Sequence, residues 1–259
     1  DMLTLEKVFN NRQNTLEWLS AIYSSVPNTF INYHQEGPLS DDMAPHAEWT
    51  GWFAYDIVGK QMGNWNPSSE DNNDYWRVLP KKIRQAQIFI QNVKPLENQN
   101  LTLEEAERMK LEARFLIAYY YALLVEFYGA VPFTAEPIDL DAPYDVLMMQ
   151  QVPVHQVIDW IDNELLEVSK GLPASYTNPT LYGRATSLMC LAVRSRLLLL
   201  SASPLLNGNK DYMNHKNPNG EELFYSEYDV NRWQRAANAA KELIDAAHAA
   251  GKKLYTVYN

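Results

Sequence analysis

The stretch EARFLIAYYYALLVEFYGAVPF, residues 112–133, decides the fold of this 259-residue chain. Its apolar side chains recur at three- and four-residue steps, the spacing of one helix face. The members of this face are Ala113, Leu116, Ile117, Tyr120, Leu123, Leu124 and Phe127. Large apolar residues also occupy the other faces, so we predict a helix that is buried on several sides and ends at Gly129, before Pro132.

A membrane span is the alternative interpretation of this stretch. Arg114, Glu126 and three consecutive tyrosine hydroxyls fall inside the roughly 20 apolar residues that a bilayer would require. The sequence therefore favours a core helix of a folded domain.

Further helices are predicted by the same periodicity and by capping residues. Asn11 or Asn14 can cap the first, and Thr102 with Glu105 forms a capping-box pattern at the start of the central helix. The other expected helices cover residues 75–93, 153–171, 184–203 and 232–250. Because no long alternating strand is found, we predict an all-α fold: an irregular tetratricopeptide-like helical scaffold with long loops.

The last predicted helix has a repeat-like texture. Trp233, Ala236, Ala237 and Ala240 follow the spacing by which a tetratricopeptide helix presents one large and several small residues to its neighbour. An ordinary Ala-rich amphipathic helix is the alternative, and the long insertion at 204–231 makes any repeat irregular. Since Trp233 lies on this apolar stripe, we expect it to be core, and we expect the same of Trp160.

Composition excludes several classes of function. The net charge is -10 and the pI is about 5.0, with no basic run, so a nucleic-acid partner is not expected. The single Cys190 allows no disulfide framework, and the five histidines lack metal-ligand spacing. No nucleotide, dinucleotide or hydrolase motif is present, so we predict no cofactor, no metal and no catalytic residue.

Residues 28–75 form a polar, non-periodic segment that is rich in aromatic side chains. Tryptophan and tyrosine faces stack on sugar rings, while carboxylates and amides bind sugar hydroxyls. We therefore predict that the ligand contacts lie within 28–76. The stacking candidates are Trp49, Trp52 and Trp65, and the hydrogen-bonding candidates are Asp41, Asp42 and Asn66. The alternative is a satellite core that holds a long loop down.

The central stretch closely resembles a helix of the SusD/RagB family of outer-membrane nutrient-binding lipoproteins. The matching parts are Glu112–Tyr121, Leu124–Val125, Tyr128–Gly129 and Val131–Pro132, and Ile117 replaces the commoner Arg. TLEKVFNNRQNTLEWLSAIYSSVP resembles the first helical segment of the family, SDD an early acidic loop motif, and GRATSLMCLAVRSRLLLLSASPL a later repeat helix. The segment 76–93 is similar to another family helix, from which Pro80 and Gln87 depart.

The resemblance implies an all-α scaffold that captures a glycan, or in some members a peptide, and delivers it to a TonB-dependent transporter. It implies a protein at the cell surface of the outer membrane, held there by a lipid anchor that is missing from this chain. Family members are about twice as long, so residues 1–259 are expected to be an N-terminal region forming a single helical domain, with the aromatic loop at 28–75. Part of the ligand surface would then lie in the other half.

Three classes of function remain open at this point. A non-catalytic glycan-binding protein is favoured by the aromatic loop. A helical-repeat adaptor for another protein is the second class, and an all-α glycoside hydrolase is the third. The paired acidic residues in the sequence are adjacent, which is not the arrangement of two carboxylates across a sugar.

Overall fold

The computed structural model describes residues 4–27, 63, 66 and 75–254. Of these residues, 62% are in α- or 3-10 helices, and β-pairing in this part of the chain is limited to isolated bridges. The all-α prediction is therefore confirmed. The α-helices are α1 (Leu5–Phe9), α2 (Arg12–Tyr23), α4 (Tyr75–Asn92), α5 (Leu103–Tyr128), α6 (Tyr144–Leu147), α7 (Val154–Gly171), α8 (Ser187–Ala202) and α9 (Asn231–Ala249).

The described residues divide into two compact units. Residues 4–24 and 81–254 belong to the first, whereas 25–27, 63, 66 and 75–80 belong to the second. All contacts described below lie within the first unit. The single helical domain expected over residues 1–259 therefore stays a prediction.

Hydroxyl and amide side chains start three of the long helices. Asn11, Thr102 and Thr186 each accept a hydrogen bond from the backbone N–H three residues later, at 3.0–3.2 Å. Asn11 rather than Asn14 is thus the cap of α2. The α4 helix contains Pro80 without a restart. The short helices α1 and α6 were not predicted, because four or five residues are too few to show a period.

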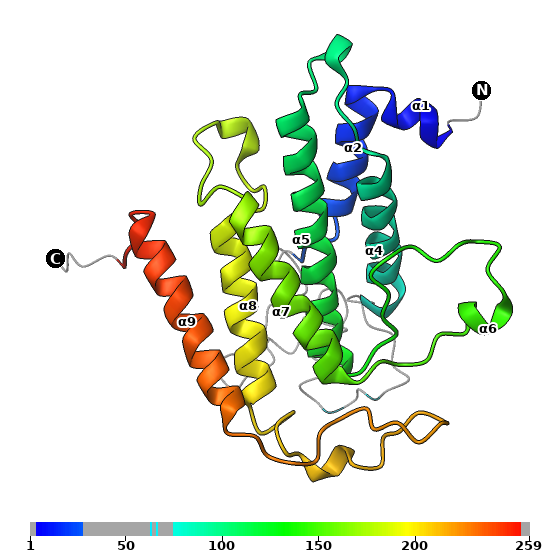
Figure 1. The fold of residues 1–259 in the computed structure, drawn as a ribbon, viewed down its shortest axis with the longest axis vertical. Helices are drawn as coiled ribbons and strands as arrows, with labels where there is room; N and C mark the ends of the chain where they lie inside the picture. Colours follow the sequence, from blue (N-terminus) through cyan, green and yellow to red (C-terminus); the bar gives the residue numbers. More distant parts are fainter. Residues whose placement is uncertain (1–3, 28–62, 64–65, 67–74, 255–259) are drawn as a thin grey trace, which may run out of the picture. The chain divides into compact units, whose positions relative to one another are not determined.

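Consecutive long helices lie side by side and run in alternating directions. Figure 1 shows α5, α7, α8 and α9 as a row that follows the chain order. Helix α5 contacts α2, α7 and α8, whereas α9 contacts α8. This up-and-down arrangement of neighbouring helices is the tetratricopeptide-like scaffold that the sequence predicts.

Helix α5 is the most continuously buried element of this unit. Its core-facing residues include Leu116, Tyr120 and Tyr121. The Tyr120 hydroxyl donates to the Ile22 carbonyl at 2.5 Å, and the Tyr121 hydroxyl donates to the Thr134 carbonyl at 3.1 Å. Burial raises the pKa of Tyr121 to about 12. The phenols therefore supply apolar area to the core while their hydroxyls keep hydrogen-bond partners.

A buried carboxylate joins α5 to its neighbours. Glu112 accepts hydrogen bonds from the Tyr23 hydroxyl at 2.9 Å, from Arg184 at 3.1 Å and from Arg108 at 3.2 Å. The Tyr23 hydroxyl in turn accepts the Ala185 N–H at 2.9 Å. Burial, followed by the nearby Glu112 charge, raises the pKa of Tyr23. Because Glu112 is fully buried, these donors are what makes its charge tolerable.

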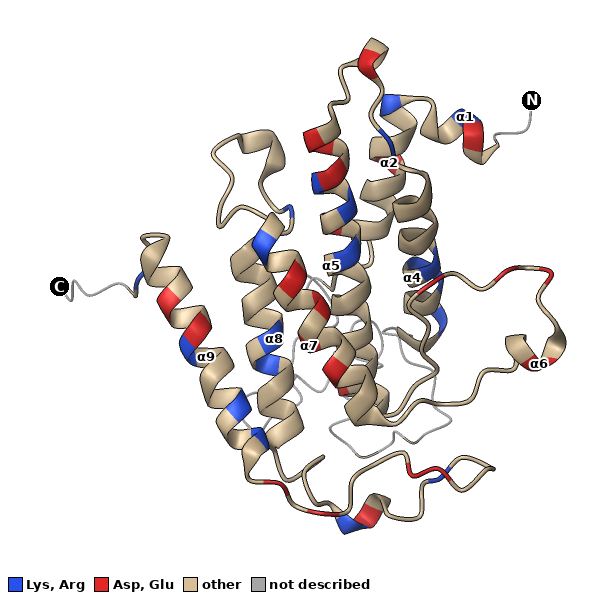
Figure 2. Ribbon diagram, viewed as in Figure 1, with Lys and Arg blue, Asp and Glu red and all other residues tan. Residues whose placement is uncertain are grey.

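A second ion network holds the outer helices together. Asp162 on α7 pairs with Arg194 on α8 and with Arg235 on α9, the latter at 2.5 Å. Arg194 also pairs with Glu242, and Arg235 with Asp159 at 2.5 Å. Figure 2 shows the acidic positions of α7 and the basic positions of α8 that form this network. Opposite charges on neighbouring helices thereby fix their register.

The two tryptophans expected in the core have different environments. Trp160 is partly buried and packs edge-on against Phe133, with ring centroids 4.9 Å apart. Trp233 is 39% exposed, so its assignment to the core is wrong for the chain described here. The reason is that α9 buries the adjacent stripe, which contains Ala236 and Ala239, and leaves the Trp233 stripe open.

Candidate functional site

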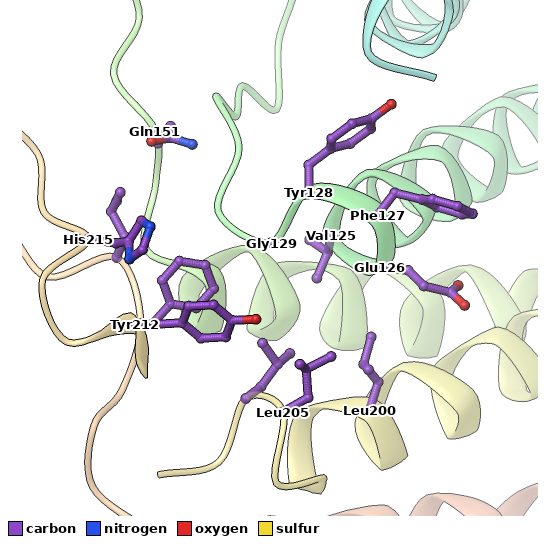
Figure 3. A pocket seen from close by; sticks show the side chains of 13 residues that line it. Val125, Glu126, Phe127, Tyr128, Gly129, Gln151, Leu200, Leu205, Tyr212 and His215 are labelled. Atoms are coloured by element: carbon purple, nitrogen blue, oxygen red, sulfur yellow. The ribbon is translucent and has the colours of Figure 1, made fainter. Parts of the chain in front are cut away.

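A pocket of about 280 Å³ lies where α5 ends and the 203–230 segment folds back. We call it the aromatic pocket. Figure 3 shows Tyr212 and His215 on one side of it and the α5 end at Val125 and Gly129 on the other. Its lining residues are Val125, Glu126, Phe127, Tyr128, Gly129, Gln151, Leu200, Leu205, Leu206, Tyr212, His215, Leu223 and Phe224.

Three rings from the 203–230 segment form one wall of the aromatic pocket. The Tyr212 and Phe224 ring centroids are 4.6 Å apart, with the planes inclined by 33°. His215 stands nearly perpendicular to both rings, at 5.8 Å from Tyr212 and 6.1 Å from Phe224. Such offset and edge-on contacts are favourable for aromatic side chains. The rings therefore hold one another in place, with Tyr212 packed on Phe224 and His215 edge-on to both.

Backbone pairing fixes the position of this wall. The Leu223 N–H donates to the His215 carbonyl at 3.1 Å, and the Asn217 N–H donates to the Glu221 carbonyl at 2.9 Å. The buried Asn217 side chain also donates to the Gln151 carbonyl at 2.8 Å. A segment rich in Asn, Gly and Pro is thus a defined turn that is tied to the start of α7.

A stack of three side chains anchors the same segment to two helices. The His155 ring on α7 lies 3.9 Å from the Tyr225 ring, and Arg232 on α9 lies 4.6 Å from the centroid of that ring. Burial lowers the pKa of His155, and Arg232 adds to this effect against the opposing Asp159. Since Tyr225 follows Phe224 directly in the sequence, this stack also helps to fix the position of Phe224 in the aromatic wall.

The glycine that ends α5 is also part of the pocket. Gly129 has φ +71°, and a Cβ atom built there would lie 2.7 Å from Phe224 Cζ. The predicted helix stop is therefore confirmed, and it leaves room for an aromatic ring at the helix end. Phe127, expected on the core face of α5, is instead 52% exposed in the last turn, where it lines the pocket.

Polar groups surround the apolar wall. Glu126 accepts from Arg196 at 2.5 Å, and the Gln151 amide donates to the Ala130 carbonyl at 2.7 Å. The hydroxyl of Tyr212 and the imidazole of His215 complete the set. A concave site with flat rings and a few placed polar groups is suited to a ligand with an apolar face and hydroxyl edges.

The predicted binding residues are not tested by this geometry. Trp49, Trp52, Trp65, Asp41 and Asp42 lie outside the described residues, and Asn66 is described as exposed. The sequence pattern does not predict the aromatic pocket, because the 204–231 insertion is rich in Asn, Gly and Pro and has no helical or strand period. Its signal was present in the aromatic residues of the insertion, namely Tyr212, Phe224, Tyr225 and Tyr228.

Within the part of the chain that the structure describes, no three His, Cys, Asp or Glu side chains are placed together to bind a metal ion. None of the described helices has the length and apolar character needed to cross a membrane.

Solved structures share this architecture. BT4246 is 30% identical in sequence and superposes with a TM-score of 0.75. The alignment covers 92% of this chain and 40% of BT4246. Surface glycan-binding protein A from Bacteroides uniformis has 20% identity and a TM-score of 0.58, covering 91% and 46%. A laminarin-binding SusD-like protein has 19% identity and a TM-score of 0.60, covering 83% and 46%. At 20% and 19% identity, the last two similarities show only a shared fold.

The chain thus spans about 40% of the length of BT4246. A search of curated protein sequences found no match. Residues 6–199 match the SusD-like family that is described as "starch-binding associating with outer membrane". This match confirms the resemblance of the central helix. The chain therefore belongs to the SusD-like family.

Proposed function

We propose that the protein is a non-catalytic carbohydrate-binding protein of the cell surface. It captures an oligo- or polysaccharide and passes it to a TonB-dependent transporter in the outer membrane, to which a lipid anchor holds it close. Membership of a family described as starch-binding supports the ligand class. The names of two structural neighbours, a surface glycan-binding protein and a laminarin-binding protein, support it as well.

The aromatic pocket is the observation that carries this proposal. The Tyr212 and Phe224 rings line the pocket beside polar groups, and a pyranose ring has an apolar C–H face and a rim of hydroxyls. The described lining contains a single carboxylate, Glu126. A glycosidase uses two carboxylates on either side of the sugar, so this pocket is suited to binding rather than hydrolysis.

The 28–76 segment is a second, separate candidate region for ligand binding. Trp49, Trp52 and Trp65 remain its stacking candidates, and Asp41, Asp42 and Asn66 remain its hydrogen-bonding candidates. The two regions can be separated experimentally, because either can be changed while the other is kept.

The test is retention on a panel of immobilised polysaccharides, together with an assay for released reducing ends. Tyr212→Ala should lower retention of the bound glycan about fivefold, the equivalent of roughly 1 kcal/mol of stacking. The control is Tyr182→Ala, which removes an exposed tyrosine outside the pocket. Tyr182→Ala should keep the melting temperature within about 2 °C, whereas Tyr212→Ala, which also loses its ring contacts with Phe224 and His215, should lower it by about 2–4 °C.

Alanine variants of Trp49, Trp52 and Trp65 test the other region in the same assay. Release of reducing ends would replace the proposal with a hydrolase. Retention of a protein or peptide without any glycan would replace it with an adaptor. Unchanged glycan retention in Tyr212→Ala would show that the aromatic pocket is not the site.

A further inference from the structure

The charged groups of the aromatic pocket limit the kind of sugar that it can take. Among the described lining residues, Glu126 alone carries a formal charge when histidines are counted as neutral. The other polar side chains of the lining are those of Tyr128, Gln151, Tyr212 and His215. A carboxylate or sulfate on a sugar would therefore meet neither a lysine nor an arginine among these lining residues.

The Glu126 carboxylate already has a cation as its partner. Arg196 on α8 donates to it at 2.5 Å, and both side chains are partly exposed. Arg196 itself belongs to the lining of the neighbouring groove between α5 and α8. Because the two charges compensate each other, the pair offers an unmatched charge to neither a cationic nor an anionic sugar.

The segment that forms the aromatic wall is acidic. Residues 203–230 contain two lysines and five acidic residues, which are Lys210 and Lys216 against Asp211, Glu221, Glu222, Glu227 and Asp229. Lys216 pairs with Glu222 at 3.0 Å, and neither lysine is among the described lining residues. Figure 2 shows the red positions of this segment and of residues 132–151, a stretch without lysine or arginine. An anionic ligand would thus approach the pocket through a negative field.

The second candidate region for ligand binding has the same sign of charge. Its sequence, residues 28–76, contains eight acidic residues and a single lysine, Lys60. The acidic residues are Glu36, Asp41, Asp42, Glu48, Asp56, Glu70, Asp71 and Asp74. Both candidate regions therefore oppose an anionic ligand, in keeping with the net charge of -10.

We infer that the protein selects uncharged glycans and rejects those that carry carboxylates or sulfates. The inference rests on the proposed function and adds the substrate class of the same site. Sites for carboxylate or sulfate groups use Arg or Lys at contact distance, whereas sugar hydroxyls are bound by amide, phenol and carboxylate oxygens such as those of Gln151, Tyr212 and Glu126. The described lining is of the second kind.

The two sources of repulsion act over different distances. Exposed charges on the surrounding segments are screened by salt, because the Debye length falls from about 10 Å at 0.1 M to about 3 Å at 1 M. Glu126 lines the pocket itself and acts on a bound group at close range. Salt therefore weakens the contribution of the segments, and substitution of Glu126 removes the local contribution.

The test is retention of the protein on two neutral polysaccharides, soluble starch and laminarin, each in three forms. The first form is unmodified, and the second is oxidised at C6 to the carboxylate. The third is the methyl ester of the second, which keeps the modified carbon without its charge. Polygalacturonate is included as an acidic polysaccharide, and retention is measured at pH 8 in about 0.1 M and about 1 M salt.

Two matched variants separate the local charge from the charge of the whole chain. Glu126→Gln keeps the shape of the lining side chain, removes its charge and leaves Arg196 uncompensated beside the pocket. Glu107→Gln is the control, because it removes one exposed carboxylate from the first half of the same helix. Each variant is scored by the ratio of oxidised to unmodified glycan that it retains, so that a change in overall affinity cancels.

The unchanged protein should be retained about tenfold less on the oxidised form than on the unmodified form, and the ester should restore most of the loss. Salt at 1 M and Glu126→Gln should each reduce this difference about threefold, whereas Glu107→Gln should leave it unaltered.

Equal retention on the oxidised and unmodified forms would overturn the charge selection and leave glycan binding intact. Loss of binding to the ester as well would overturn it too, because shape rather than charge would then exclude the C6 group. Retention on polygalacturonate alone would also overturn the selection while glycan binding stands. If none of these glycans is retained, the inference fails together with the proposed function.

Discussion

Helices α5 and α9 are both long and both carry an apolar stripe, yet the chain uses them differently. Helix α5 contacts α2, α7 and α8 and buries residues around most of its circumference. Helix α9 contacts α8 through the stripe of Ala236 and Ala239, whereas the stripe that contains Trp233 is open to solvent. Sequence periodicity thus identifies an apolar face, but the number of neighbouring helices decides whether that face is covered.

The largest expected effect tests the buried side of this comparison. Glu112→Ala removes the carboxylate that pairs with Arg108 and Arg184, so it should lower the free energy of unfolding by about 3–5 kcal/mol. Glu107→Ala, which removes an exposed carboxylate of the same helix, should change it by about 0.5 kcal/mol or less. Urea unfolding curves measure both, and similar losses would mean that α5 is not anchored through Glu112.

The ion network between α7 and α9 should matter somewhat less. Asp162→Ala leaves Arg194 and Arg235 without their shared partner, and we expect a loss of about 2–4 kcal/mol. Amide hydrogen exchange should become faster in α9 than in α5, because α9 has fewer other contacts. The control is Asp159→Ala, an exposed position of the same network. If the amides of α9 exchange at the same rate in Asp162→Ala as in the unchanged protein, the network does not hold α9 in place.

Two identical substitutions on α9 distinguish its covered stripe from its open one. Ala239→Leu adds volume against α8 and should cost about 1–3 kcal/mol. Ala237→Leu adds the same volume at an exposed position and should cost about 0.5 kcal/mol or less. Thermal unfolding gives both values. Equal costs would show that the Trp233 stripe is covered in the protein in solution.

The smallest effect at neutral pH concerns Tyr121, one of the buried phenols of α5. Tyr121 has a folded-state pKa of about 12 against an ordinary value of 10.0, so the unfolded chain loses this proton first as the pH rises. Its contribution to stability is complete below pH 10 and declines by about 1.4 kcal/mol per pH unit up to pH 12.

Tyr121→Phe removes that dependence and also removes the hydrogen bonds to Thr134. It should therefore be about 1 kcal/mol less stable than the unchanged protein at pH 8, and this difference should shrink or reverse by pH 12. Urea unfolding at several pH values measures it. A constant difference from pH 8 to pH 12 would contradict the raised pKa.

Much of the scaffold could be predicted from local signals. The caps at Asn11 and Thr102 and the stop at Gly129 are encoded within a few residues, and the stripe from Val154 to Leu165 is buried as its spacing predicts. Short-range hydrogen bonding and helical spacing do not depend on distant parts of the chain. These features could therefore be predicted without a structure.

The aromatic pocket could not be predicted in the same way. Tyr212, His215 and Phe224 come together through a turn, and Gly129 meets them from a position far away in the sequence. Nothing in the local pattern reports such long-range contacts. The Glu112 network is similar, because its partners Tyr23 and Arg184 lie 89 residues before it and 72 residues after it in the sequence.

Gly129 carries two separate requirements in one residue. Its positive φ ends α5, and its missing side chain gives the Phe224 ring its place. An Asn at this position would strain the backbone, because φ +71° with ψ −117° lies outside the left-handed helical region that Asn tolerates, and its Cβ would also push the ring aside. A smaller residue at 224 would relieve the crowding without restoring the pocket wall. A side chain at 129 is therefore unfavourable whatever residue stands at 224, because a smaller residue there removes the crowding and leaves the backbone strain.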